Sequence, residues 1–166
     1  PQTVTVTLHV RGVTAYWALD EEEGLTAHDS SGAGYDGTLV HFTDPNHIGT
    51  AGKIGNCLTF DGIDDHVEVS GYCGIDGDRP RTVCAWIRTS QVGMILTYGD
   101  VGTGNRWIFF VNSDGNLQIG VSGANLISSE VVADGQWHHA AAVLEAPAEG
   151  PARVQDLRLY IDGQPA

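Results

Sequence analysis

Three aspartates within five residues form one of the two stretches of this chain best suited to holding a cation. Asp61, Asp64 and Asp65 surround Gly62 in the segment 54–69, IGNCLTFDGIDDHVEV, which we interpret as two short strands around an acidic turn. Three like charges this close repel one another, so a cation, nearby backbone N–H groups or solvent must offset them. We expect Asp61-Gly62 to shape the turn, and we assign a second metal position to Asp64 and Asp65.

The first metal position is expected in the loop 27–36, AHDSSGAGYD. Turn-forming residues in this loop can direct several backbone carbonyls to one point, and Asp20 or Asp29 adds a carboxylate. Such hard oxygen ligands suit Ca²⁺, which takes about six to eight of them. The loop lacks the DxDxDG spacing of an EF-hand, so the alternative is a turn that satisfies its own polar groups.

Aromatic side chains are the other candidates for ligand contact. Four tryptophans occur in the chain, namely Trp17, Trp86, Trp107 and Trp137. Exposed tryptophans would stack on sugar rings, although a tryptophan in a strand is more often a core residue. Trp107, together with Arg106 and Tyr98, is the exposed aromatic group that we favour as a ligand site.

Neither the histidine pair nor the cysteines form a metal motif. His138 and His139 are adjacent in a strand and point to opposite faces, so we expect one of them to be a hydrogen-bonded core residue. Cys57, Cys73 and Cys84 match no zinc spacing. We interpret Cys57 and Cys84 as small buried strand residues, and one disulfide with a leftover thiol stays open as an alternative.

Composition limits the classes of partner. The 166 residues suffice for one domain, and the net charge of −13 argues against a nucleic-acid partner, which would require a basic face. No apolar run approaches the roughly 18 residues needed to span a bilayer, so we expect no membrane insertion.

Alternation with a period of two predicts strands along almost the whole chain. It is strictest in residues 3–10, TVTVTLHV, and it also predicts strands at residues 15–20 and 116–121. No segment of ten or more residues keeps a helical period. Residues 82–88 are apolar on both faces, which predicts a central strand covered on both sides. Turn signals at residues 113–115 and 162–163 mark hairpins. The fold predicted is therefore an all-β, antiparallel two-sheet sandwich.

Five segments in order strengthen this interpretation: YWALDEEEGLTAHDSSGAGYDGTL, GKIGNCLTFDGIDDHVEV, RTVCAWIRT, GQWHHAAAVLE and LRLYIDGQPA. Together they resemble the LamG-like jelly-roll domains of the concanavalin A-like lectin/glucanase superfamily, over roughly residues 13–166. The resemblance implies two packed antiparallel sheets and often one structural Ca²⁺. It implies that the ligands of this ion are Asp20, Asp29 and backbone carbonyls of the segment that runs from Ser31 to Gly34.

In two respects the chain differs from the family pattern. Family members usually continue after the IDG turn through further strands, whereas this sequence stops at Ala166. We expect a single domain over residues 1–166, in which the extra strand at residues 1–12 fills the vacated place or an uncovered edge pairs with another copy. The absent final segment often supplies a carboxylate to the calcium site.

These observations predict a noncatalytic, secreted or cell-surface module that binds carbohydrate or glycan or acts in adhesion, with a structural calcium site. The alternatives are a module that binds protein but no sugar and a degenerate glycoside hydrolase. Sandwich glucanases of the superfamily carry an ExDxxE-type pair of glutamates, and this chain has no such pair. It also has no GxSxG elbow and no HExxH motif.

Overall fold

Short antiparallel strands joined by turns make up the fold, as the period-two alternation predicts. The computed structural model describes residues 12–43, 49–75, 77–99, 106–121, 123–147 and 150–166, so the strand expected at 3–10 lies outside the described residues. Within the described residues the one helical segment is the 3-10 helix η2, Val154–Asp156. The all-β class with antiparallel sheets is confirmed.

The chain divides into two compact units, Pro1–Tyr72 and Cys73–Ala166. Unit 1 contains five short strands: β1 Thr26–Ala27, β2 Gly37–Val40, β3 Thr50–Ala51, β4 Asn56–Cys57 and β5 His66–Glu68. They form a three-stranded sheet in the order β1-β2-β5 and a separate pair, β3-β4.

The core of unit 1 is small. Among the described residues its buried cluster is Ala27, Leu39 and Leu58, with Trp17 and Val67 among the half-buried residues around it. Strands β2 and β5 approach so closely that a Cβ on Gly37 of β2 would lie 2.5 Å from a methyl group of Val67. A glycine is therefore required there for the two strands to pair.

Two sequence predictions for unit 1 are wrong. The segment 54–69 is not a hairpin, because β4 pairs with β3 and β5 pairs with β2. The strand expected at residues 15–20 is reduced to a single bridge between Trp17 and Asp29. β4 pairs locally with β3, the strand just before it, whereas β5 pairs with β2 from earlier in the chain, so tertiary context overrides the pairing that the alternation suggested.

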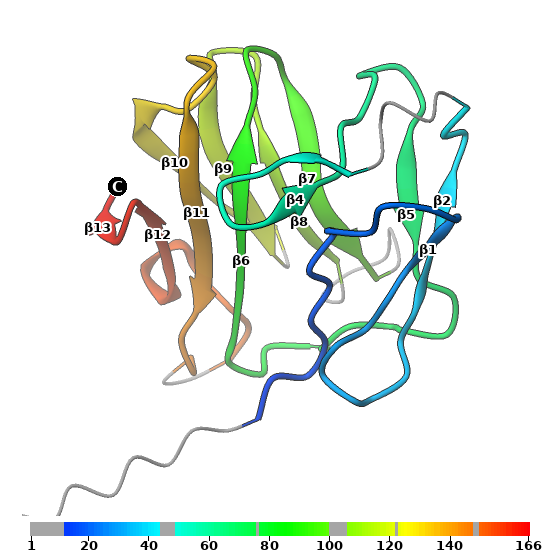
Figure 1. The fold of residues 1–166 in the computed structure, drawn as a ribbon. Coiled ribbons are helices and arrows are strands. Elements are labelled where there is room, and N and C mark those ends of the chain that lie inside the picture. Colours follow the sequence, from blue (N-terminus) through cyan, green and yellow to red (C-terminus); the bar gives the residue numbers. More distant parts are fainter. Residues whose placement is uncertain (1–11, 44–48, 76, 100–105, 122, 148–149) are drawn as a thin grey trace, which may run out of the picture. The chain divides into compact units, whose positions relative to one another are not determined.

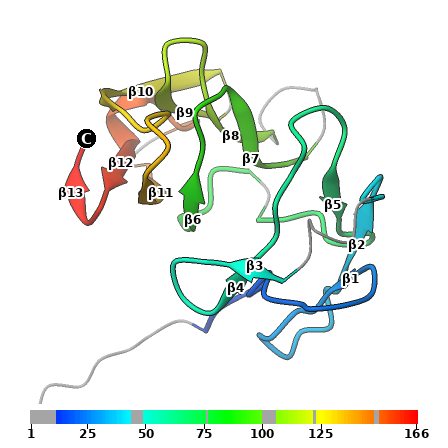
Figure 2. The ribbon, with the colours of Figure 1, turned by 45° about the horizontal axis from the view of Figure 1, so that its top comes forward.

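Unit 2 holds the larger part of the strand structure. Its strands are β6 Arg81–Arg88, β7 Gly93–Tyr98, β8 Trp107–Val111, β9 Asn116–Val121, β10 Ala124–Val131, β11 Trp137–Leu144, β12 Leu157–Ile161 and β13 Gln164–Pro165. They form two four-stranded sheets, which we name the β6 sheet (β13-β12-β11-β6) and the β8 sheet (β10-β9-β8-β7). Figures 1 and 2 show β8 and β9 in one layer and β6 and β11 in the other.

One hydrophobic core joins the two sheets of unit 2. Alternate residues of β8 and β9, such as Phe109 and Ile119, are fully buried, and so are alternate residues of β11 and β12, such as Ala142 and Leu157. Because residues i and i+2 share a face, the side chains between them point away from this core. The hairpin turns predicted at 113–115 and 162–163 join β8 to β9 and β12 to β13, and both are confirmed.

The prediction that residues 82–88 form a strand covered on both faces is wrong. Strand β6 lies at one end of its sheet and alternates between exposed and half-buried residues after Arg81. Cys84 is one of the exposed residues, which corrects the expectation that it is buried. All three cysteines are free in the structure.

Candidate functional site

The outward face of the β6 sheet gathers aromatic and basic side chains. The register pairs Trp86 of β6 with His139 of β11, and Arg88 with Trp137, so these four side chains lie in two adjacent rows on one face. Their neighbours Ala140 and Ala142 point into the core. On β12, Tyr160 pairs with Ala141 and therefore lies on the same face. We call Trp86, Arg88, Trp137, His139 and Tyr160 the aromatic face.

Close contacts hold the rings of the aromatic face in place. The Trp86 ring is 39% exposed and stands edge-on to His139, with 5.3 Å between ring centres. The guanidinium of Arg88 lies over the ring of Trp137, 5.1 Å from its centre. A cation over an indole restricts both side chains. The face therefore offers ordered aromatic surface to solvent.

Behind this face, His138 is held between two carboxylates. Its Nδ1 lies 2.9 Å from Oδ2 of Asp162, and its Nε2 lies 3.2 Å from Oδ1 of Asp134. Only the imidazolium form donates at both nitrogens. Burial by itself would lower the pKa of His138, but the bonds to Asp162 and Asp134 outweigh it and raise the pKa above its ordinary value.

Asp162 links this pair of ion contacts to the aromatic face. Its Oδ1 accepts the backbone N–H of His139 at 2.8 Å, and this bond, ahead of the one from His138, lowers the pKa of Asp162. The expectation that one of the two histidines is hydrogen-bonded and largely buried is confirmed by His138, whose side chain is 17% exposed. His139 points to the other face, toward Trp86.

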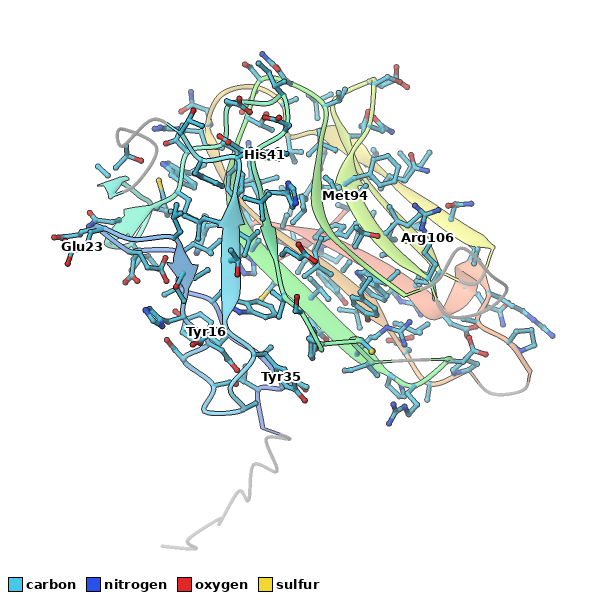
Figure 3. The ribbon with its side chains drawn as sticks, turned by 90° about the vertical axis from the view of Figure 1, so that its right-hand side faces the viewer. Tyr16, Glu23, Tyr35, His41, Met94 and Arg106 are labelled. Atoms are coloured by element: carbon cyan, nitrogen blue, oxygen red, sulfur yellow. The ribbon has the colours of Figure 1, made fainter. Side chains whose placement is uncertain are left out.

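The ligand group expected at Tyr98, Arg106 and Trp107 does not present an exposed ring. Trp107 is fully buried, and Tyr98 stacks parallel to it with 6.2 Å between ring centres. The buried guanidinium of Arg81 covers Trp107 at 4.8 Å from the ring centre. Arg106 precedes β8 and is exposed (Figure 3). The expectation of exposure at Trp107 is wrong because this residue occupies a core-facing position of β8.

In the loop expected to hold calcium, Asp29 acts as an anchor for backbone N–H groups. Its Oδ1 accepts the N–H groups of Tyr16 and Ser31 at 3.0 and 2.9 Å, and its Oδ2 accepts that of Tyr35 at 3.0 Å. Hydrogen bonds, that from the Ser31 side chain above all, hold the pKa of Asp29 well below its usual range. Figure 3 shows Tyr16 and Tyr35 at the same end of unit 1.

This arrangement fits a bound Ca²⁺ poorly. Three N–H donors directed at Asp29 already balance its charge, whereas a calcium site needs oxygen ligands directed at one point. Asp20 and Gly34 are exposed, and the Ser31 hydroxyl accepts the N–H of Ala33 at 3.2 Å. These contacts agree with the alternative, a turn that satisfies its own polar groups, and the calcium site in this loop stays a prediction.

The acidic turn has a different geometry. An oxygen from each of Asp61, Asp64 and Asp65 lies within 4.8 Å of the others. Oδ1 of Asp61 accepts the N–H groups of Ile63, Asp64 and Asp65 at 2.8, 3.3 and 3.4 Å, so Asp61 anchors its turn as Asp29 anchors its loop. The N–H of Asp61 donates to Oδ2 of Asp65 at 2.9 Å. The turn thus combines internal hydrogen bonds with three converging carboxylates, a donor set that suits a hard cation.

A comparison with known protein families identifies the superfamily to which the chain belongs. A family model described as the concanavalin A-like lectin/glucanases superfamily matches residues 60–166, which is more than half of the chain. The chain belongs to the concanavalin A-like lectin/glucanase superfamily. This superfamily includes both enzymes and proteins without catalytic activity. No curated protein and no solved structure matched the chain.

For this superfamily member, the described residues contain no helix with the length and hydropathy of a membrane span.

Sequence reasoning did find the turn Asp61–Asp65 but missed the aromatic face. The pairing of Trp86 with His139 follows only from the register of two strands about fifty residues apart. The available signal was the alternation in residues 82–88, which places Trp86 and Arg88 on the side opposite Val83 and Ile87.

Proposed function

We propose that this chain is a noncatalytic carbohydrate-binding module of a secreted or cell-surface protein, and that the aromatic face is its ligand surface. The observation that supports the proposal is the exposed Trp86 ring, held edge-on by His139 and flanked by the Arg88–Trp137 pair. An indole offers a flat apolar surface to the C–H face of a sugar. Arginine and histidine beside it supply hydrogen-bond donors for hydroxyl or carboxylate groups.

The side chains of the aromatic face suit a small polar ligand better than a large apolar one. Exposed apolar surface is interrupted by Arg88, and Tyr160 and His139 are half-buried with polar atoms at their tips. Rigid aromatic residues lose little conformational entropy on binding, which favours recognition by a few of them. Membership in a superfamily of lectins and glucanases agrees with a sugar ligand.

A glycan array tests the proposal. We expect the labelled chain to bind a subset of glycans and the Trp86→Ala variant to lose at least about tenfold in affinity, as for truncation of an aromatic anchor. The matched control is Ile127→Ala, because Ile127 is 52% exposed on the outward face of the other sheet of unit 2. Silence of the folded wild-type chain on a diverse array would end the proposal.

A protein-binding module is the second candidate, and the outward face of the β8 sheet favours it. Met94, Phe110, Gln118 and Ile127 form one row across four strands, and Met94 and Ile127 are both more than half exposed. Exposed apolar rows of this kind mark surfaces that bind other proteins. In this case Met94→Ala and Ile127→Ala would weaken binding of a protein partner, whereas Trp86→Ala would not.

We further infer that a structural Ca²⁺ binds at the acidic turn. Three carboxylates, those of Asp61, Asp64 and Asp65, converge there, whereas within the described residues the loop 27–36 brings no such group of three together. Calorimetric titration of metal-stripped protein with Ca²⁺ is the test. We expect binding that Asp65→Asn weakens and Asp20→Asn leaves unchanged, and absence of heat at millimolar Ca²⁺ would contradict it.

A further inference from the structure

Two histidines of unit 1 lie side by side at the ends of neighbouring strands. His66 belongs to β5 and pairs with Val40 of β2, and His41 directly follows Val40. In a regular strand His41 would point to the face opposite Val40. Its φ of 68° instead places its backbone in the left-handed region, so β2 ends at the preceding residue, Val40. The two imidazole rings are 5.7 Å apart between centres and nearly perpendicular. Figure 3 labels His41 at the end of β2 remote from Tyr35.

One residue orients both rings. Nδ1 of His41 lies 3.0 Å from Oδ2 of Asp64, and Nδ1 of His66 lies 2.8 Å from the backbone carbonyl oxygen of the same Asp64. A carboxylate and a carbonyl only accept hydrogen bonds, so each neutral ring must carry its proton on Nδ1. The lone pair is then on Nε2 in both rings. Metal-binding histidines are characteristically held in this way, with one nitrogen donating to a carboxylate or carbonyl and the other bound to the ion.

The spacing of the rings suits a shared ion. With metal–nitrogen bonds of about 2.1 Å, two imidazoles on one tetrahedral ion have ring centres roughly 5 Å apart. The observed 5.7 Å differs from this by an amount that small side-chain rotations can close. Among the described residues, neither Nε2 has a hydrogen-bond partner, and the His41 side chain is 54% exposed. An ion can therefore enter from solvent.

Charge around the pair also favours a cation. The carboxylate of Asp64 contacts His41, and Asp61 and Asp65 lie next to Asp64. Imidazole nitrogen is a ligand for borderline ions such as Zn²⁺ and Cu²⁺, whereas Ca²⁺ prefers oxygen. We propose that His41 and His66 form a two-imidazole site for a borderline divalent cation, with Asp64 orienting both rings and water completing the coordination. This site is independent of the carbohydrate proposal, because it lies in unit 1.

The experiment uses the tag-free chain and the metals alone. Calorimetry with ZnCl₂ measures affinity, and electron paramagnetic resonance of one added equivalent of Cu²⁺ reports how many imidazole nitrogens bind the ion. We expect two equatorial nitrogens in the wild type and one in His41→Asn and in His66→Asn. Each variant should weaken Zn²⁺ binding at least tenfold. Asparagine tolerates the left-handed backbone of residue 41, so the first variant is expected to fold.

The matched control is His28→Asn, since His28 is an exposed histidine of unit 1 that faces Asp36 and belongs to neither strand of the pair. It should bind both metals as the wild type does. A circular-dichroism spectrum and melting curve establish that each variant is folded. Unchanged Zn²⁺ affinity in folded His41→Asn and His66→Asn would overturn the proposal.

Discussion

Unit 1 and unit 2 of this chain are stabilised in different ways. In the described part of unit 2, fifteen buried residues from β8, β9, β10, β11, β12 and their connections form one core between two sheets. In unit 1 the buried cluster among the described residues is only Ala27, Leu39 and Leu58. Because burial of apolar surface is the main favourable term in folding, unit 2 gains far more from it than unit 1 does.

Carboxylates that bind the backbone replace part of that core in unit 1. Asp29 accepts the N–H group of Tyr16 and those of Ser31 and Tyr35 in its own loop, and Asp36 accepts the N–H of Asp29 at 2.7 Å. Glu21 accepts the N–H of His28 at 2.8 Å, and Asp61 organises its own turn. In unit 1 these carboxylates therefore have a structural role. They hold loops in place by accepting backbone N–H groups, because the loops bury too little apolar surface to be held by packing.

The largest expected effect concerns the core of unit 2. Trp107→Ala removes a fully buried ring that packs against Tyr98 and Arg81, and we expect it to lower the free energy of unfolding by about 3–5 kcal/mol. Trp86→Ala, at a position that is 39% exposed and in edge-on contact with His139, should lower it by only about 1 kcal/mol. Urea denaturation followed by circular dichroism gives both values. Equal effects of the two substitutions would contradict the division into core and surface tryptophans.

An acid-sensitive effect is expected in unit 1. The pKa of Asp29 is lowered in the folded chain, so its stabilising contribution is present above the ordinary value of 3.8 and declines as the pH falls below it. Asp29→Asn should speed amide exchange at Tyr16, Ser31 and Tyr35 at neutral pH, with little effect on the β8 sheet. Hydrogen exchange read by mass spectrometry measures this. The exposed Asp20→Asn is the matched control, and equal exchange in the two variants would argue against the anchor.

A smaller effect of opposite sign is expected at His138. Its pKa is raised in the folded chain, so its contribution is fully present below the ordinary value of 6.5 and is lost as the pH rises through the higher folded value. The melting temperature of the wild type should fall over this range. His138→Gln should remove that dependence, whereas His28→Gln, which alters a histidine of unit 1, should leave it. An unchanged pH profile in His138→Gln would show that the contacts to Asp134 and Asp162 do not stabilise the fold.

Local signals in the sequence predicted what depends on local structure. Strand β9, Asn116–Val121, has the bounds that its alternation predicts, and the Asp162-Gly163 turn joins β12 to β13. Asp162 and Gly163 both have positive φ, which these residue types tolerate. The family resemblance added the sheet class. Such features require only a few neighbouring residues and are therefore readable from the chain.

Features that depend on distant pairing were not readable. Apolar residues on both faces of 82–88 suggested a covered strand, but the position of β6 at the end of its sheet is decided by its pairing with β11. Trp86 and Trp107 each lie within two residues of an arginine, and only the register shows that one faces solvent and the other the core. The anchor at Asp29 likewise joins residues 13 positions apart.

The four tryptophan side chains can report directly whether the aromatic face is the ligand surface. Each indole N–H gives one signal in a ¹H–¹⁵N spectrum of labelled protein, and single substitutions assign them. On titration with the strongest glycan from the array, we predict that the signals of Trp86 and Trp137 shift while those of Trp17 and Trp107 stay in place, since Trp17 donates to Tyr35 and Trp107 is buried. Shifts confined to Trp17, or binding that leaves all four signals unchanged, would contradict the assignment of the aromatic face as the ligand surface.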